Sequence, residues 1–189
     1  MTAKDEKPLP VTLLPFQGTP FHVLDWLAAD LQDRGFSTLI PAPAPLPPEA
    51  YAPERHQYSA GPLLAIVHAV PGQHVLGITD RDLYSKELNF VFGMAEHPGK
   101  AAVIALPRLQ IGADGDRFCM RVLKEALHEL GHTFGLGHCP NPRCVMHFSN
   151  SLIDTDYKQA AFCPPCQTRL PSPLSAHPGL ALDESSTER

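Results

Sequence analysis

The most informative stretch of the chain is residues 128–166, HELGHTFGLGHCPNPRCVMHFSNSLIDTDYKQAAFCPPC. Two sets of metal-ligand residues meet in it: His128, His132 and His138, followed by Cys139, Cys144, Cys163 and Cys166. Three imidazoles leave a fourth zinc position free for water, whereas four thiolates close their metal off. We therefore expect two zinc ions per chain, one catalytic and one structural, joined at the adjacent pair His138-Cys139.

The first set has the spacing of a catalytic metal site. On a helix His128 and His132 are one turn apart, so both rings project from one face and can share an ion. Glu129 lies one residue round from His128, where its carboxylate can reach a water on the metal and act as general base. Gly135 permits a left-handed turn at the helix end, which brings His138 back to the metal.

The four cysteines allow a rival interpretation, two disulfides. The N-terminus is charged, and the apolar run from Val11 to Leu14 is too short for the core of a signal peptide, so we expect a cytoplasmic protein. A reducing compartment favours a zinc thiolate site over disulfides. The fifth cysteine, Cys119, is expected to be an inert buried residue.

The composition indicates one soluble globular domain. The chain has 189 residues with 43% hydrophobic content, enough for one core. Its formal net charge of -5 gives no reason to expect nucleic acid or an anionic membrane as a partner. No apolar stretch is long enough to span a bilayer. We expect a monomer that acts on peptides.

Hydrophobic periodicity predicts a mixed sheet with helices between its strands. Strands are expected at residues 11–16, 36–40, 74–79, 89–93 and 101–106, and helices at 21–34, 60–70 and 116–134. The two last strands are close enough in sequence for one to run antiparallel. Prolines at 41–48 predict an extended connection, which could border the cleft. The segment 171–189 is expected to be a disordered tail.

The pattern from His128 to His138 is that of the metzincin metallopeptidases, and the added cysteines with Cys144-Val-Met146 resemble the archaemetzincin family. The spacer from Met146 to Cys163 is one residue shorter than the family signature. Segments 51–58 and 76–84 also resemble that family. The resemblance implies an α+β zincin fold with a mixed five-stranded sheet, an antiparallel edge strand and a long active-site helix. It also implies a methionine turn at Met146 beneath the zinc.

In domain terms the resemblance implies one catalytic domain over residues 1–170. Its N-terminal subdomain covers about 8–137, and a short C-terminal subdomain with the structural zinc covers about 138–170. The implied reaction is hydrolysis of a peptide bond by a zinc-activated water with Glu129 as base. The substrate is expected to lie antiparallel to the strand at 89–93.

Two alternatives are weighed against this function. One is a non-proteolytic zinc protein that binds peptides or partners on the same scaffold; the intact Glu129 argues against it. The other is a nucleic-acid module built on the cysteines, which the few nearby cations disfavour: Arg143, Lys158 and Arg169.

Some roles stay open in the sequence. Some metzincins carry a tyrosine two residues after the turn methionine, but Phe148 stands there, so the group that stabilises the oxyanion is unassigned. His147 and Tyr157 are weak candidates. Arg55 and Gln57 could orient a substrate, or equally hold a loop by structural hydrogen bonds.

Overall fold

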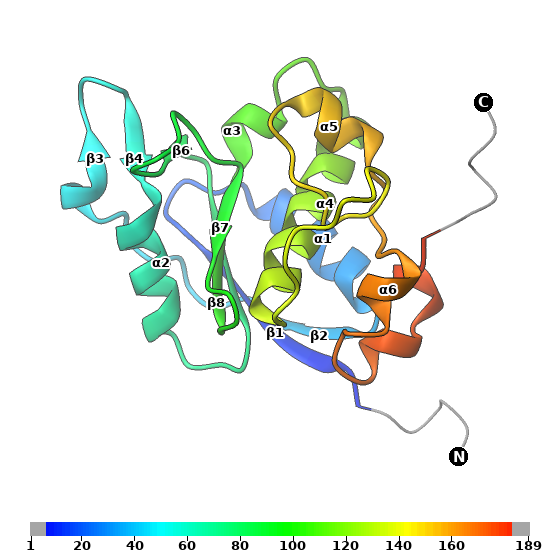
Figure 1. Cartoon of the computed structure of the whole chain (residues 1–189). Coiled ribbons are helices and arrows are strands. Elements are labelled where there is room, and N and C mark those ends of the chain that lie inside the picture. Colours follow the sequence, from blue (N-terminus) through cyan, green and yellow to red (C-terminus); the bar gives the residue numbers. More distant parts are fainter. Residues whose placement is uncertain (1–6, 183–189) are drawn as a thin grey trace.

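A computed structural model describes residues 7–182 and contains a five-stranded sheet in the order β2-β1-β5-β8-β7 (Figure 1). The strands are β1 (Leu9–Pro15), β2 (Phe36–Leu39), β5 (Val75–Thr79), β7 (Gly93–Ala95) and β8 (Ala101–Ala105). The first four strands in this order are parallel, and β7 pairs antiparallel with β8 at the edge. The predicted mixed sheet with an antiparallel edge strand is confirmed.

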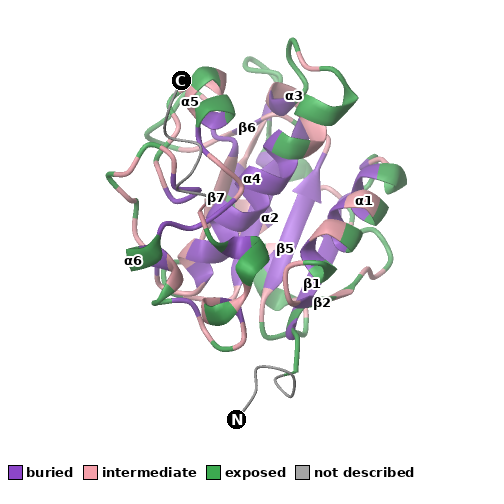
Figure 2. Cartoon of the chain, turned by 90° about the vertical axis from the view of Figure 1, so that its right-hand side faces the viewer, coloured by how far each residue is buried: buried purple, intermediate pink, exposed green. Residues whose placement is uncertain are grey.

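Helices cover both faces of this sheet. Helix α2 (Ala60–Ala69) packs on β5 and β8 from one side, while α1 (Phe21–Gln32) and α4 (Gly115–Thr133) lie on the other. Each face buries its own apolar cluster, and both β5 and α4 are buried along most of their length (Figure 2). Strands buried on both faces read as continuous apolar runs, which is why β5 and β8 were recognisable from sequence.

Helix α4 is the predicted active-site helix. It begins after Asp114, whose side chain accepts a hydrogen bond from the Arg117 backbone N–H. Aspartate is one of the residues preferred at this N-cap position. Its apolar stripe faces the sheet and α1. A second buried stripe is polar: Arg121, Lys124, Glu125 and His128 contact the C-terminal segment, and Glu129 lies against β7. The helix therefore joins the main core to the residues that carry the chemistry.

Smaller elements complete the fold, and the sequence did not predict them. A second sheet of three short strands contains β3 (Tyr51–Ala52), β4 (Gln57–Ser59) and β6 (Leu83–Tyr84). Short helices are η1 (Pro48–Ala50), α3 (Leu106–Leu109), α5 (Leu152–Tyr157) and α6 (Pro164–Gln167). The proline connection 41–48 is irregular up to η1, with Pro47 in an extended conformation and one isolated bridge from Ala44 to Phe16.

Two predictions about extent were wrong. The strand predicted at 89–93 is β7 at Gly93–Ala95, because Val91 N–H bonds to Leu83 of the small sheet instead of continuing the main ladder. The segment predicted as a disordered tail is packed as far as residue 182, with η2 (Leu174–Ala176) and η3 (Pro178–Leu180) burying Leu174 and Leu180 completely. The rest of that tail, 183–189, lies outside the described residues. Among residues 7–182, none of the helices has the length and apolar character needed to cross a bilayer.

Candidate metal centres

Helix α4 and the turn after it bring three imidazoles together. The Nδ1 atoms of His128 and His132 each lie 2.8 Å from a backbone carbonyl oxygen, of Val145 and Leu136 respectively. A carbonyl can only accept, so both Nδ1 atoms carry hydrogen and both Nε2 atoms present lone pairs. These Nε2 atoms are 3.2 Å apart. Two lone pairs at that distance repel, and a cation between them removes the repulsion.

His138 completes this group from the other side. Gly135 has a φ of 86°, a left-handed conformation that a side chain disfavours, and it turns the chain after α4. One ligand nitrogen from each of the three histidines lies within 4.8 Å of the other two. Ligands at the usual zinc–nitrogen distance on a tetrahedron are about 3.3 Å apart, so the three rings fit one zinc ion with a position left over.

The surroundings keep these imidazoles neutral, the form that binds metal. Burial lowers the pKa of His132 to about 4 and lowers that of His128 well below the usual range, with Lys158 adding to the effect at His128. Burial also lowers the pKa of His138, although its ring is the most exposed of the three. All three rings are therefore unprotonated near neutral pH.

Glu129 lies beside these histidines and against the edge strand. Its side chain is buried, and burial followed by the charge of Glu125 raises its pKa well above the usual carboxyl range. A Cβ added at Gly93 would stand 2.6 Å from both Cγ and Oε1 of Glu129. Only glycine at the start of β7 therefore lets this carboxylate approach the edge of the sheet so closely.

A cavity of about 580 Å³ opens over these groups. Its walls include Glu129 and the three histidines, together with the segment before β7, β7 itself and residues 148–150 after the methionine. The only ionisable side chains in the lining besides the histidines are carboxylates, Glu125 and Glu129. Residues 41–48 do not line it, so the idea that the proline connection borders the cleft was wrong.

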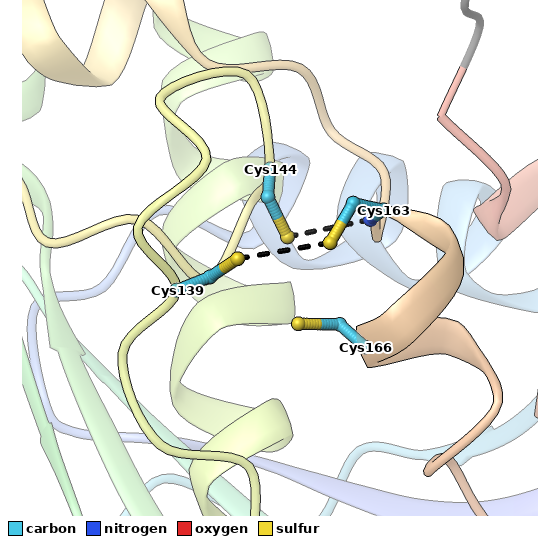
Figure 3. Close-up of side chains that lie close together, drawn as sticks. All are labelled: Cys139, Cys144, Cys163 and Cys166. Atoms are coloured by element: carbon cyan, nitrogen blue, oxygen red, sulfur yellow. Dashed lines mark hydrogen bonds between the residues drawn. The ribbon is translucent and has the colours of Figure 1, made fainter.

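The four cysteines form a second cluster (Figure 3). Cys139 and Cys144 come from the loop after α4, and Cys163 and Cys166 come from the N-cap and the body of α6. All four sulfur atoms lie within 4.8 Å of one another, and the Sγ atoms of Cys139 and Cys163 are 3.6 Å apart. Sulfur atoms on a zinc tetrahedron are about 3.8 Å apart, whereas a disulfide needs about 2.05 Å. All five cysteines are free, so the geometry fits a zinc thiolate site and not two disulfides.

Electrostatics in the cysteine cluster also fit a cation. Burial raises the pKa of the Cys144 thiol to about 12, and burial together with its sulfur neighbours raises that of Cys166. Backbone N–H of Cys163 donates to the Cys144 sulfur over 3.3 Å, which stabilises thiolate charge. Four thiolates held this closely are stable only around a positive ion.

Backbone hydrogen bonds connect the two clusters. The carbonyl that orients His128 belongs to Val145, which lies between a cluster cysteine and Met146. The N–H of Cys139 donates to the carbonyl of Met146 over 2.9 Å. The loop from Cys139 to Met146, which directly follows His138, is therefore closed by one of these hydrogen bonds and joined to His128 by the other.

Met146 is fully buried, as expected for a turn beneath the histidines. A Cβ on Gly131 of α4 would overlap its sulfur, so the thioether packs directly on the helix between His128 and His132. Phe148 has its ring 4.8 Å from that of His138 and lines the cavity.

Three weaker predictions have plain outcomes. His147 does not line the cavity; its Nδ1 bonds to the Cys139 carbonyl over 2.9 Å. Tyr157 also lies outside the lining, largely exposed under Arg143. Cys119, expected to be buried, is only partly so.

Two ionisable cavity residues escaped the sequence analysis. Glu125 lies one helical turn before Glu129, and that spacing was the signal that could have found it. His97 follows the edge strand, and its ring centroid is 5.7 Å from that of His132. No motif marks His97, because the fold alone brings it to the histidines.

Comparison with known proteins agrees with this geometry. The signature of peptidase family M54 matches residues 65–172. Archaemetzincin from Pyrococcus furiosus is 40% identical over 176 residues, which cover 85% of this chain and 91% of that protein. The chain belongs to the archaemetzincin family. The archaemetzincin crystal structure from Methanopyrus kandleri superimposes with a TM-score of 0.77 at 40% identity, covering 84% of this chain and 91% of that one.

A second archaemetzincin structure, from Archaeoglobus fulgidus, has a TM-score of 0.79 at 36% identity and covers 86% of this chain and all of that one. The protein is accordingly a zinc metallopeptidase with peptides as its substrates. Its three-histidine and four-cysteine clusters are consistent with one catalytic and one structural zinc ion. The family resemblance read from residues 128–166 is confirmed.

Proposed function

We propose that the protein hydrolyses peptide bonds with Glu129 as general base, at a zinc ion held by His128, His132 and His138. The observation that carries the proposal is the position of Glu129, buried between the histidines and Gly93 at the wall of the cavity. Zinc bound there would polarise the scissile carbonyl and lower the pKa of water to about 7.

Glu129 takes the proton of the attacking water. Its position beside the histidines at the cavity wall lets its carboxylate accept that proton and then deliver it to the leaving amine. Because Glu129 is buried, bulk water cannot take its place as proton acceptor or as proton donor to the leaving amine. The His128 and His132 rings stay fixed throughout by their bonds to carbonyl oxygens.

The substrate backbone is expected to pair with β7. Ala105 N–H donates to the Phe92 carbonyl, and Glu96 N–H donates to that of Ala101, so these β7-side residues face the sheet. By alternation Gly93 and Ala95 turn their N–H and C=O groups outward. An extended peptide bonded to that free edge passes directly over Glu129.

The test uses the zinc-loaded full chain and a diverse peptide-library digest. Glu129→Gln should retain two zinc ions per chain and lose at least about 10³-fold in cleavage rate, because the proton acceptor is gone. His132→Ala should retain one zinc and also lose cleavage. If Glu129→Gln cleaves as fast as wild type, the assignment of the base is wrong. A fully loaded wild type that cleaves none of the peptides would favour a binding function.

A further inference from the structure

The rim of the cavity, residues 88–92, is held by side chains that do not themselves enter it. The rim supplies one wall of the cavity and runs directly into β7. Its last part is fixed by backbone bonds, from Val91 N–H to Leu83 and from Ala105 N–H to Phe92, of 2.9 and 2.8 Å. Its first part, Asn89 and Phe90, is held differently.

Two side chains converge on the Asn89 carbonyl oxygen. Arg55 Nη2 donates to it over 2.8 Å and Gln57 Nε2 over 3.0 Å. Arg55 Nε also donates to the Gln57 amide oxygen over 2.9 Å, which fixes the amide so that its NH₂ group points at the rim. Gln57 is almost fully buried, so its donors are matched inside the protein.

Asp82 is the hub of this network. It accepts from Gln57 over 2.9 Å and from Arg108 through two parallel bonds of 2.7 and 2.8 Å. The Arg108 guanidinium also lies over the Phe90 ring, 4.2 Å from its centroid. Arg108 belongs to α3, immediately after β8, so the network connects the small sheet, the main sheet and the rim.

We propose that Arg55, Gln57, Asp82 and Arg108 form a clamp that positions the rim and β7 for the peptide substrate. None of the four lines the cavity, so they are positioning residues and touch no reacting atom. A rim that shifts would carry Gly93 with it and misalign the free edge. The inference rests on the proposed docking of substrate at β7.

The clamp has a geometry that needs arginine. Arg108 uses its planar fork to bind both oxygens of Asp82 while its flat face covers Phe90. A lysine would keep the charge but lose the second hydrogen bond and the stacking. Arg108→Lys is therefore a conservative probe of positioning.

The experiment compares Arg108→Lys and Asp82→Asn with wild type and with Arg121→Lys, all zinc-loaded. Arg121 makes the same bidentate contact to Asp156 between α4 and α5. Its Nη1 also donates to the Leu109 and Ile111 carbonyls at the end of α3, and all of these partners lie outside the rim. The measurements are zinc content, melting temperature, amide exchange over residues 88–95, and steady-state cleavage of a quenched peptide taken from the library digest.

In the two clamp variants KM should rise about fivefold or more while kcat stays within about twofold, because docking is impaired and the chemistry is not. Exchange of rim amides should accelerate about tenfold, with α4 unchanged. Arg121→Lys should lower the melting temperature and leave KM and rim exchange unaltered.

Unchanged KM or unchanged rim exchange in the clamp variants would overturn the proposal, as would an equal rise of KM in Arg121→Lys. A wild type that cleaves no peptide would instead overturn the proposed function. Amide exchange of the rim in the clamp variants, compared with wild type, would then still test whether the clamp orders the rim.

Discussion

The buried pair of Lys158 and Glu125 gives the sharpest prediction about stability. The Lys158 side chain is fully buried, and its Nζ lies 3.0 Å from Oε1 of Glu125, which is 4% exposed. Neither atom meets the geometry of a hydrogen bond, so their attraction is that of opposite charges. Lys158→Met leaves the Glu125 carboxylate buried without a partner.

Removal of one member of such a pair costs about 3–5 kcal/mol, because the remaining charge keeps its desolvation penalty. For a domain of this size that lowers the melting temperature by about 6–20 °C. The double variant Glu125→Gln with Lys158→Met strands no charge and should recover at least about half of the loss. Thermal and urea unfolding of the zinc-loaded protein measure both variants.

Lys124→Met is the matched control. Lys124 is also a buried lysine, but its Nζ donates to the carbonyls of Thr155 and Asp156, both over 3.0 Å. Its removal leaves two neutral acceptors and should cost only about 1–3 kcal/mol. The reasoning is refuted if Lys158→Met costs no more than this control, or if the double variant is less stable than the single one.

Three further predictions follow from contacts near the two clusters. Gly93→Ala should lower kcat by about tenfold or more with both zinc ions kept, because the new methyl displaces Glu129; equal kcat for the variant and wild type would contradict the close approach. Cys139→Ser should remove the structural zinc and, through the loop, weaken cleavage as well as stability, measured by metal analysis and activity at 25 °C. Hydrogen bonds from Arg121 lower the pKa of Asp156, so that pair stabilises the fold above the ordinary carboxyl pKa and its effect is lost as pH falls through the lowered value. The difference in melting temperature between wild type and Asp156→Asn should therefore shrink from pH 6 to pH 3, and a constant difference would count against it.

The metal clusters were predictable because their chemistry is local in sequence. His128 and His132 share one helix, and Cys163 and Cys166 share one turn, so residue type and spacing determine what they can bind. The strands β5 and β8 were predictable for a similar reason, since continuous apolar runs need two covered faces.

What the sequence did not reveal depends on contacts between distant segments. The rim was mistaken for a strand because its apolar residues fit the pattern, while the Asn89 carbonyl is held by side chains more than thirty positions away. His97 reaches the histidines only through the position of β7. Residues 171–182 are rich in proline, yet the side chains of Leu174 and Leu180 are fully buried in the core.

The hydrogen bond from His128 to the Val145 carbonyl implies an order in which the two metal clusters form. A newly made chain can form α4 and place His128 and His132 a turn apart without any ion. The carbonyl that holds the first ring and the loop that carries His138 adjoin the four cysteines, so we expect both to become rigid only after these cysteines have bound their ion. Peptide cleavage should therefore appear only after the four-cysteine cluster has bound its ion.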